Sequence, residues 1–263
     1  TENADGDLST FFYTATERSE VVHILDQLEK ERKELFSLNN YAIFYRTNAQ
    51  SRIFEEELMK RGIKYRLIGG VRFYQRKEVK DILSYLRLIV NPQDELSLRR
   101  IINLPARGIG EITLAQYRIR AEHTGQSLYA CLGQKLEGIS DRAAKTTLEF
   151  KLLIEEFRGL RIPLADLIDQ VIHRSGYHAM LLASGDETDL DRLDNIFELI
   201  TMAKEKAAGL DPENPLPVFL EQISLMTDMD TADTEKEAVT LMTIHSAKGL
   251  EFPVVFIAGL EEG

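Results

Sequence analysis

The chain has 263 residues, of which 44% are hydrophobic and 29% charged, and its formal net charge is −11. This length allows one large domain or two small ones, and the composition is typical of a soluble globular protein. The single cysteine, Cys131, excludes an internal disulfide and a multi-cysteine metal site, and fits a reducing cytosol. The five histidines show no metal-ligand spacing, so we expect no metal site. No apolar run approaches the roughly 20 residues of a membrane span, and no secretory signal opens the chain, so we expect no membrane partner.

Positive charge is concentrated in one segment of this acidic chain. Residues 60–120 hold 14 Lys or Arg and five Asp or Glu. The negative net charge argues against a nucleic-acid partner, but a contiguous basic segment indicates one, and the distribution of charge matters more than its sum. The alternative is chance clustering of charges on solvated helix faces.

Strand and helix patterns alternate in the first part of the chain. Apolar runs predict strands at 9–14, 41–45 and 65–68, and amphipathic spacing predicts helices at 17–35 and 50–61. Gly62 follows the second helix at the position where helices commonly end. Strands separated by helices favour a parallel sheet with crossover helices.

A polar string follows the strand at 41–45. Arg46 and Arg52 flank a loop that opens a helix, a place suited to bind phosphate or a partner domain through N–H groups and guanidinium donors. The alternative is that Asn48 and Ser51 cap the helix and Arg52 packs on its surface.

A glycine pair, Gly69-Gly70, follows the strand at 65–68 and leads into another amphipathic helix. Arg72, Arg76 and Lys80 in this string are candidates for contact with a DNA backbone. Phe73 is a candidate for stacking on a nucleobase, and its alternative is an aromatic anchor of the core.

From Asn91-Pro92 to about residue 235 the patterns are helical and include no convincing strand. A helical domain inserted within an α/β domain explains this interruption. Within it, Arg107-Gly108-Ile109-Gly110 separates two helical patterns, and Thr113 lies in the first turn of the second. Two glycines permit a tight turn, Ile109 can pin it between the helices, and the N–H groups of the second helix form an anion site. This pattern looks like a helix–hairpin–helix motif that clamps duplex phosphates, and the alternative is a plain turn between helices.

The β pattern resumes near the end of the chain, after a predicted last helix at 218–226 and a polar linker at 227–236. Runs at 239–244 and 254–258 predict buried strands of a parallel sheet. The loop between them holds polar residues, and ligands of open α/β sheets bind at the carboxyl ends of strands. The alternative is an ordinary connection with solvated charges.

The string Thr243-Ile244-His245-Ser246-Ala247-Lys248-Gly249-Leu250-Glu251-Phe252 closely resembles motif V of superfamily 1 DNA helicases of the UvrD/PcrA/Rep type. Residues 45–52 resemble motif IVa of that family, and residues 69–82 and 107–110 resemble further segments of it. The resemblance implies an α/β plus all-α fold. A partial RecA-like parallel sheet domain (2A) would occupy residues 1–90 and 237–263, and the inserted helical domain (2B) residues 91–236.

Carried over to this chain, the resemblance implies three groups of site residues. Glu251 and Gly249 would bind the nucleotide, with Glu251 on its ribose. Single-stranded DNA would be contacted, or coupled to the nucleotide, by Thr243, His245, Lys248, Arg46 and Arg52. Duplex DNA would be held by Arg72, Arg76, Lys80, Arg107, Gly108, Ile109, Gly110 and Thr113. For His245, a buried position oriented only by packing is the alternative.

The resemblance also implies an activity. It is that of an ATP-dependent DNA helicase or translocase, which moves 3′ to 5′ and unwinds duplex DNA in repair or replication in the bacterial cytoplasm. Its partners would be single-stranded DNA and the duplex junction, and repair or replication proteins bound through the helical insert. No Gly-x-x-x-x-Gly-Lys-Ser/Thr string and no Walker B pair occurs. The chain also stops before the arginine-bearing motif VI. We therefore expect ATP and Mg²⁺ to be held mainly by a domain absent from this chain, and no ATP hydrolysis by the chain alone. The alternatives are a non-catalytic duplex-binding or protein-interaction regulatory module, and a subunit of a helicase–nuclease.

Overall fold

The computed structural model describes residues 8–32, 37–211, 214–230 and 237–260. Its contacts divide the chain into two compact units. The sheet unit comprises residues 1–70 and 233–263, and the helical unit comprises residues 71–232. The fold is therefore mixed α/β and all-α, as the sequence predicts.

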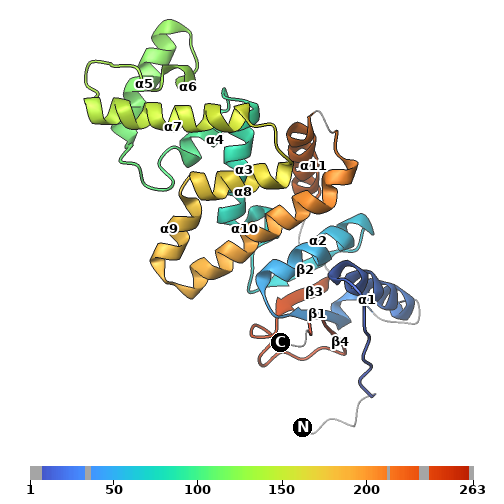
Figure 1. Ribbon diagram of the computed structural model, residues 1–263. Coiled ribbons are helices and arrows are strands. Elements are labelled where there is room, and N and C mark those ends of the chain that lie inside the picture. The colour runs from blue at the N-terminus through green and yellow to red at the C-terminus, as the bar shows by residue number, and fades with distance from the viewer. Residues whose placement is uncertain (1–7, 33–36, 212–213, 231–236, 261–263) are drawn as a thin grey trace. The chain divides into compact units, whose positions relative to one another are not determined.

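Four strands form one parallel sheet in the sheet unit (Figure 1). They are β1 (Tyr41–Tyr45), β2 (Tyr65–Ile68), β3 (Val239–Thr243) and β4 (Val254–Ile257), in the order β2-β3-β1-β4. Ile43 of β1 lies opposite Leu241 on one side and Phe256 on the other. Strands about 200 residues apart in the sequence thus share one sheet. The central β3 is almost wholly buried, as a parallel strand covered on both faces should be.

Two helices of the sheet unit, α1 (Glu17–Arg32) and α2 (Ser51–Lys60), pack against each other and supply the core under the sheet. Leu25 and Leu28 of α1 and Phe54 and Leu58 of α2 are buried in one cluster with the strands. Short 3-10 helices precede and follow β1, η1 (Leu38–Asn40) and η2 (Asn48–Gln50).

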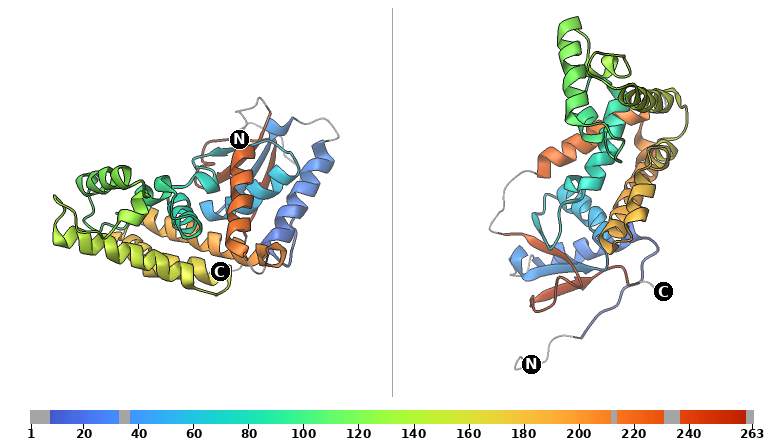
Figure 2. Two further views of the ribbon diagram at one scale, coloured as in Figure 1. Left: turned by 90° about the horizontal axis from the view of Figure 1, so that it is seen from above. Right: turned by 90° about the vertical axis from the view of Figure 1, so that its left-hand side faces the viewer.

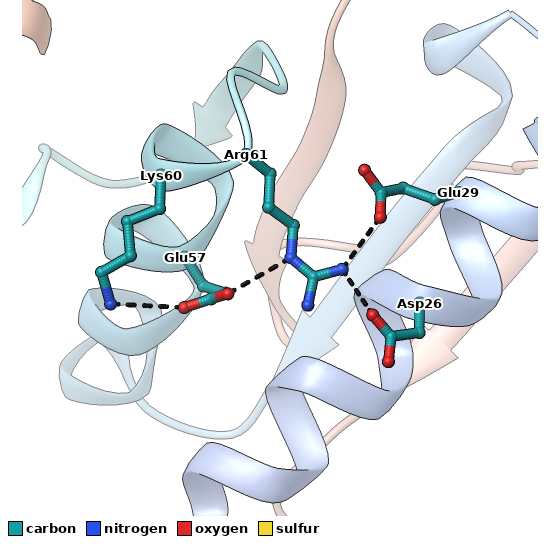
Figure 3. Close-up of polar contacts among 5 residues, drawn as sticks. All are labelled: Asp26, Glu29, Glu57, Lys60 and Arg61. Carbon is teal, nitrogen blue, oxygen red and sulfur yellow. Dashed lines mark hydrogen bonds and ion pairs between the residues drawn. The ribbon is translucent and has the colours of Figure 1, made fainter.

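Arg61, at the C-terminal end of α2, joins these two helices (Figure 3). Its Nη1 donates to Asp26 Oδ1 at 2.7 Å and Glu29 Oε2 at 3.0 Å, both on α1, and its Nε donates to Glu57 Oε1 at 3.2 Å. Lys60 Nζ reaches the other oxygen of Glu57 at 3.3 Å. Burial raises the pKa of Glu57, but the hydrogen bonds from Arg61 and Lys60 outweigh it, so the pKa lies below its usual value.

The predicted strand at 9–14 is wrong. Residues 8–14 form no strand, and the side chains of Phe11 and Tyr13 are 75% and 99% exposed. A β-prone run becomes a strand only when another strand offers it a hydrogen-bonding edge, and none of the described strands pairs with this one.

The helical unit consists of helices of very different length, and its described residues include no strand (Figure 2). They are η3 (Phe73–Gln75), α3 (Lys77–Val90), α4 (Glu95–Ile101), α5 (Glu111–Thr124), α6 (Leu128–Cys131), α7 (Asp141–Gly159), α8 (Leu164–Arg174), α9 (Tyr177–Ser184), α10 (Glu187–Lys206), η4 (Ala207–Gly209) and α11 (Pro215–Asp230). Helix α11 continues into the predicted linker as far as Asp230, and residues 231–236 of that linker lie outside the described residues.

Helix α3 is central to the helical unit and contacts α4, α7, α8, α10 and α11 (Figure 1). Most of its apolar side chains, among them Val79, Ile82 and Leu86, are completely buried. The unit therefore begins at Val71, earlier than the boundary at residue 90 that we expected from the sequence, because the helix before that boundary packs with the insert. Phe73 is fully buried in the same core, which makes it an anchor rather than a stacking platform.

Candidate nucleotide and nucleic-acid interface

The carboxyl edge of the sheet gathers the loops that carry the helicase-like strings. Because all described strand pairs are parallel, their carboxyl ends meet at one edge. The loop after β1 begins at Arg46, Gly69-Gly70 follows β2, and the turn at 244–249 follows β3. Loops widely separated in the sequence are thus brought to the same edge of the sheet.

Glycine at position 69 allows two of these loops to touch. Gly69 has a φ of +74°, and a Cβ added there would lie 2.6 Å from Ser246 Oγ. Ser246 is itself fixed, because its Oγ lies 2.9 Å from Thr243 Oγ1 and its N–H donates to that oxygen at 3.3 Å. A Cβ added at Gly70 would lie 3.3 Å from Asn48 Oδ1. The glycine pair therefore lets the end of β2 contact the loops that follow β1 and β3.

Gln50 organises the loop after β1. Its Oε1 accepts hydrogen bonds from the N–H groups of Arg46 at 2.9 Å and Thr47 at 3.1 Å. A Cβ added at Gly259 would lie only 2.3 Å from the amide nitrogen of Gln50, so this close approach requires a glycine. Gly259 also has a φ of +70°. The N–H of Gly259 in turn donates to Glu20 Oε1 of α1 at 3.0 Å. Sequence reasoning gave Gln50 no role; the only signal was its place in a capping-box pattern at the start of a helix.

The turn after β3 presents its polar side chains to solvent. His245, Lys248 and Glu251 are exposed, and Gly249 has a φ of +84°. The exposure of His245 removes the alternative of a buried, packing-oriented imidazole. Hydrogen bonds from the Ala247 N–H to Thr243 O at 3.1 Å and from Leu250 N–H to Ala247 O at 3.0 Å shape the turn. An anion-binding cation, an imidazole and a carboxylate acceptor are thus displayed from one shaped loop.

Arg46 and Arg52, predicted as a pair, have different environments. Arg46 is exposed at the carboxyl edge. Arg52 is only 1% exposed and forms an ion pair with Glu56 at 3.3 Å. A guanidinium enclosed in this way cannot reach a DNA phosphate without leaving its pair, which costs several kcal/mol for a buried ion. We therefore correct the expected DNA contact of Arg52 to a structural ion pair.

Arg76, in the helical unit, is also a structural residue. It is 7% exposed, its Nε donates to Val71 O at 3.0 Å, and its Nη1 donates to Asn195 Oδ1 at 2.7 Å. Asn195 Nδ2 donates to Glu78 Oε1 at 2.6 Å, so this network ties the start of α3 to α10. The expected duplex contact of Arg76 is corrected accordingly. Arg72 and Lys80 are half-buried.

The predicted hairpin connects α4 and α5. Gly108 has a φ of +73° and is exposed, whereas Ile109 is 2% exposed and lies in the core of the helical unit. Gly110 caps α5 and offers no side-chain acceptor. The first N–H groups of an α-helix lack intrahelical acceptors, and this end carries the positive end of the helix dipole. The open turn before α5, where Thr113 is half-buried, therefore has the form of an anion-binding hairpin.

Asn103, at the end of α4, holds this hairpin and was not identified from the sequence. Its Oδ1 accepts from the N–H of Arg107 at 2.7 Å and from the N–H of Ile109 at 3.2 Å. An asparagine that accepts from backbone groups further along a turn is a known turn former, and that was the available signal.

Arg107 does not have the environment of a free cation. Its guanidinium donates to five oxygens at 2.9–3.2 Å: Ile101 O, Ile102 O, Pro105 O, Tyr85 Oη and Ser175 O. The guanidinium carbon also lies 5.2 Å from the centre of the Phe150 ring. This half-buried guanidinium thus has internal partners in addition to the phosphate contact expected from the sequence.

The described residues contain no cluster of three or more His, Cys, Asp or Glu side chains arranged to hold a metal ion. No helix in the described part of the chain is long and apolar enough to cross a membrane.

The whole chain is similar in sequence to known proteins. The family model described as UvrD-like helicase C-terminal domain matches residues 1–263. The chain is 41% identical over 284 residues to ATP-dependent DNA helicase UvrD1 of Mycobacterium tuberculosis, covering 100% of this chain and 37% of that protein. It is 41% identical over 269 residues to ATP-dependent DNA helicase PcrA of Staphylococcus aureus, covering 100% of this chain and 36% of that protein. The chain thus spans just over a third of the length of these relatives. By its match over the full length and by this identity, the chain belongs to the UvrD-like helicase C-terminal domain family.

Proposed function

We propose that the chain is part of an ATP-dependent DNA helicase that moves 3′ to 5′ and unwinds duplex DNA in repair or replication in the bacterial cytoplasm. The observation that carries this proposal is the carboxyl edge of the sheet. There a shaped loop exposes His245, Lys248 and Glu251 in a chain whose relatives are named ATP-dependent DNA helicases.

The sheet unit contributes one side of the nucleotide site and a path for single-stranded DNA. The exposed carboxylate of Glu251 suits the ribose, because carboxylate oxygens accept hydrogen bonds from ribose hydroxyls. Gly249, with its positive φ and no side chain, lets the nucleotide approach the backbone. Lys248 and Arg46 supply positive charge for DNA phosphates, and Thr243 and His245 join the DNA path to the nucleotide side of the same loop.

When bound, ATP supplies the free energy of its hydrolysis. This chain's residues bind and orient the nucleotide. ATP and Mg²⁺ are held mainly by a domain of the longer protein outside this chain. The sequence has no phosphate-binding loop string, and we expect the purified chain alone to hydrolyse no ATP.

The helical unit holds duplex DNA through its hairpin. The N–H groups of residues 110–113 bind phosphate at the open end of α5, and Ile109 anchors the turn in the core. Arg72 and Lys80 add charge from the start of α3. Because such contacts involve phosphate, this binding does not depend on base sequence. Repair or replication proteins would bind to other surfaces of the same unit.

The test is binding of the purified chain to fluorescent duplex, single-stranded and 3′-tailed duplex DNA across a salt series. We expect binding to duplex-containing DNA that weakens steeply as salt rises. No binding to any of the three at low salt would refute the assignment of DNA contacts to this chain.

A Gly108→Ala/Gly110→Ala variant of the longer protein separates the helicase from a non-catalytic duplex-binding module. A helicase whose hairpin grips the duplex loses unwinding and keeps DNA-stimulated ATP hydrolysis. If neither activity changes, the hairpin has no part in unwinding.

A further inference from the structure

We infer that Arg107 is a positioning residue, which sets the hairpin before DNA arrives, and that phosphate binds to the backbone of 110–113 and not to this guanidinium. The inference rests on the proposed duplex binding by the hairpin. It assigns the only arginine of the Arg-Gly-Ile-Gly string to a role opposite to the one its sequence context indicates.

Both terminal nitrogens of the Arg107 guanidinium are engaged inside the protein. Arg107 Nη1 donates to the carbonyl oxygens of Ile101, Ile102 and Pro105 at 3.1–3.2 Å. These carbonyls lie at the end of α4 and just beyond it, where a helix has acceptors without intrahelical donors and the negative end of its dipole. A cation placed there stabilises the helix end that leads into the hairpin.

Arg107 also joins three separate segments of the helical unit. Its Nη2 donates to Tyr85 Oη on α3 at 2.9 Å and to Ser175 O, beyond the end of α8, at 2.9 Å. Tyr85 Oη donates to Leu104 O in the hairpin segment at 2.6 Å. Burial raises the pKa of Tyr85 although Arg107 lowers it, so its hydroxyl stays protonated and able to donate. A planar group with five donors can serve all these acceptors at once, and a lysine ammonium cannot.

The consequence is a preorganised binding turn. Asn103 fixes the N–H groups of Arg107 and Ile109, and the Arg107 guanidinium fixes the carbonyls of Ile101 and Pro105, which precede and follow Asn103 in the chain. The N–H groups of 110–113 are then left oriented for a ligand. A turn held rigid in its bound form binds more tightly, because less ordering remains to be done on association.

The test begins with amide hydrogen exchange in the DNA-free chain at the hydrogen-bonded amides of the turn: Ile109, whose N–H donates to Asn103 Oδ1, and Leu114, whose N–H donates to Gly110 O. Arg107→Gln and Tyr85→Phe each break part of the internal network, so we expect exchange of these amides to accelerate about tenfold, the effect of losing one hydrogen bond to a charged group. Arg120→Gln, which removes an exposed cation from α5, is the matched control and should leave exchange unchanged. Unchanged exchange in Tyr85→Phe and Arg107→Gln overturns the inference.

The second arm measures duplex affinity against salt. A residue that neutralises a phosphate lowers the slope of log K against log salt by about 0.9 when it is removed. A positioning residue weakens binding by the same factor at every salt concentration, so the Arg107→Gln line should run parallel to wild type. Tyr85→Phe keeps the charge and should also run parallel but weaker.

These outcomes separate the inference from the proposed function. A slope reduced by about 0.9 in Arg107→Gln alone overturns the positioning role. If wild type binds no duplex, the proposed function fails, and the exchange measurement still decides whether Arg107 sets the turn. If Arg107→Gln does not fold by circular dichroism, Tyr85→Phe decides both arms.

Discussion

The contact between Gly69 and Ser246 gives the sharpest prediction for the sheet unit, with Gly62 as a built-in control. Both glycines have positive φ, +74° and +65°. A Cβ at position 62 would meet nothing within 4 Å, whereas one at position 69 would lie 2.6 Å from Ser246 Oγ and 3.2 Å from Ser246 Cβ. The two substitutions to alanine therefore share a backbone cost and differ in a steric one.

The magnitudes follow from these two terms. A left-handed backbone costs a non-glycine residue about 1–2 kcal/mol. For Gly62→Ala this is the whole effect. In Gly69→Ala the serine must also rotate away, which breaks its 2.9 Å hydrogen bond to Thr243 and adds about 1 kcal/mol. We expect Gly69→Ala to destabilise the sheet unit by about 2–3 kcal/mol and Gly62→Ala by about 1–2 kcal/mol.

The assay is urea denaturation followed by circular dichroism. Because the two compact units need not unfold together, the transition that shifts in Gly62→Ala identifies the sheet unit. A second substitution, Ser246→Gly, removes the obstructing atoms and should bring Gly69→Ala close to the control value. Equal destabilisation by the two alanines, with no gain from Ser246→Gly, would refute the argued contact between the loops after β2 and β3.

Three further predictions follow from the charges and hydrogen bonds. Glu57→Gln should lower the free energy of unfolding at pH values above about 4.3, the normal pKa of a glutamate, and should have little effect at pH values below the lowered pKa of Glu57 in the folded state. The reason is that a carboxyl group with a lowered pKa stabilises the fold only while it is ionised. Urea unfolding at pH 7 and pH 3 measures this, and an equal loss of stability at both pH values contradicts it. Lys248→Ala should weaken binding to single-stranded DNA and reduce the slope of log K against log salt by about 0.7. Lys145→Ala, which removes an exposed charge from the helical unit, is the control. An unchanged slope in Lys248→Ala would mean that Lys248 does not contact the DNA. Tyr177→Phe should destabilise the helical unit by about 1.5–3 kcal/mol, since it leaves the buried Asp81 without the 2.7 Å hydrogen bond from this hydroxyl; thermal unfolding measures it, and no change would mean that Arg100 alone satisfies that carboxylate.

Local sequence patterns were sufficient to predict most of the strands and helices. The runs at 41–45, 65–68, 239–244 and 254–258 contain the parallel strands, which end at Thr243 and Ile257 in the last two runs. The last run was expected to be buried, but β4 lies at the sheet edge, with Val255 41% and Ile257 49% exposed. Gly108 of the hairpin has the positive φ that a tight turn needs. A β-branched run restricts its own backbone, and a glycine permits the positive φ that a tight turn needs, so the sequence alone indicates these elements. The same holds for the helical character of the insert.

Tertiary structure decided what each arginine does. Arg46 and Arg107 both precede turns in basic or polar strings, yet one is exposed and the other donates to five internal oxygens. Three of these oxygens belong to carbonyls within six residues of Arg107, and the other two belong to Tyr85 and Ser175, which lie 22 and 68 residues away in the sequence. The run at 9–14 has strand-forming side chains and no partner strand. The sequence by itself determined the elements and the loops that carry polar chemistry; burial and pairing, which depend on contacts between distant segments, decided which charges remain available to a ligand.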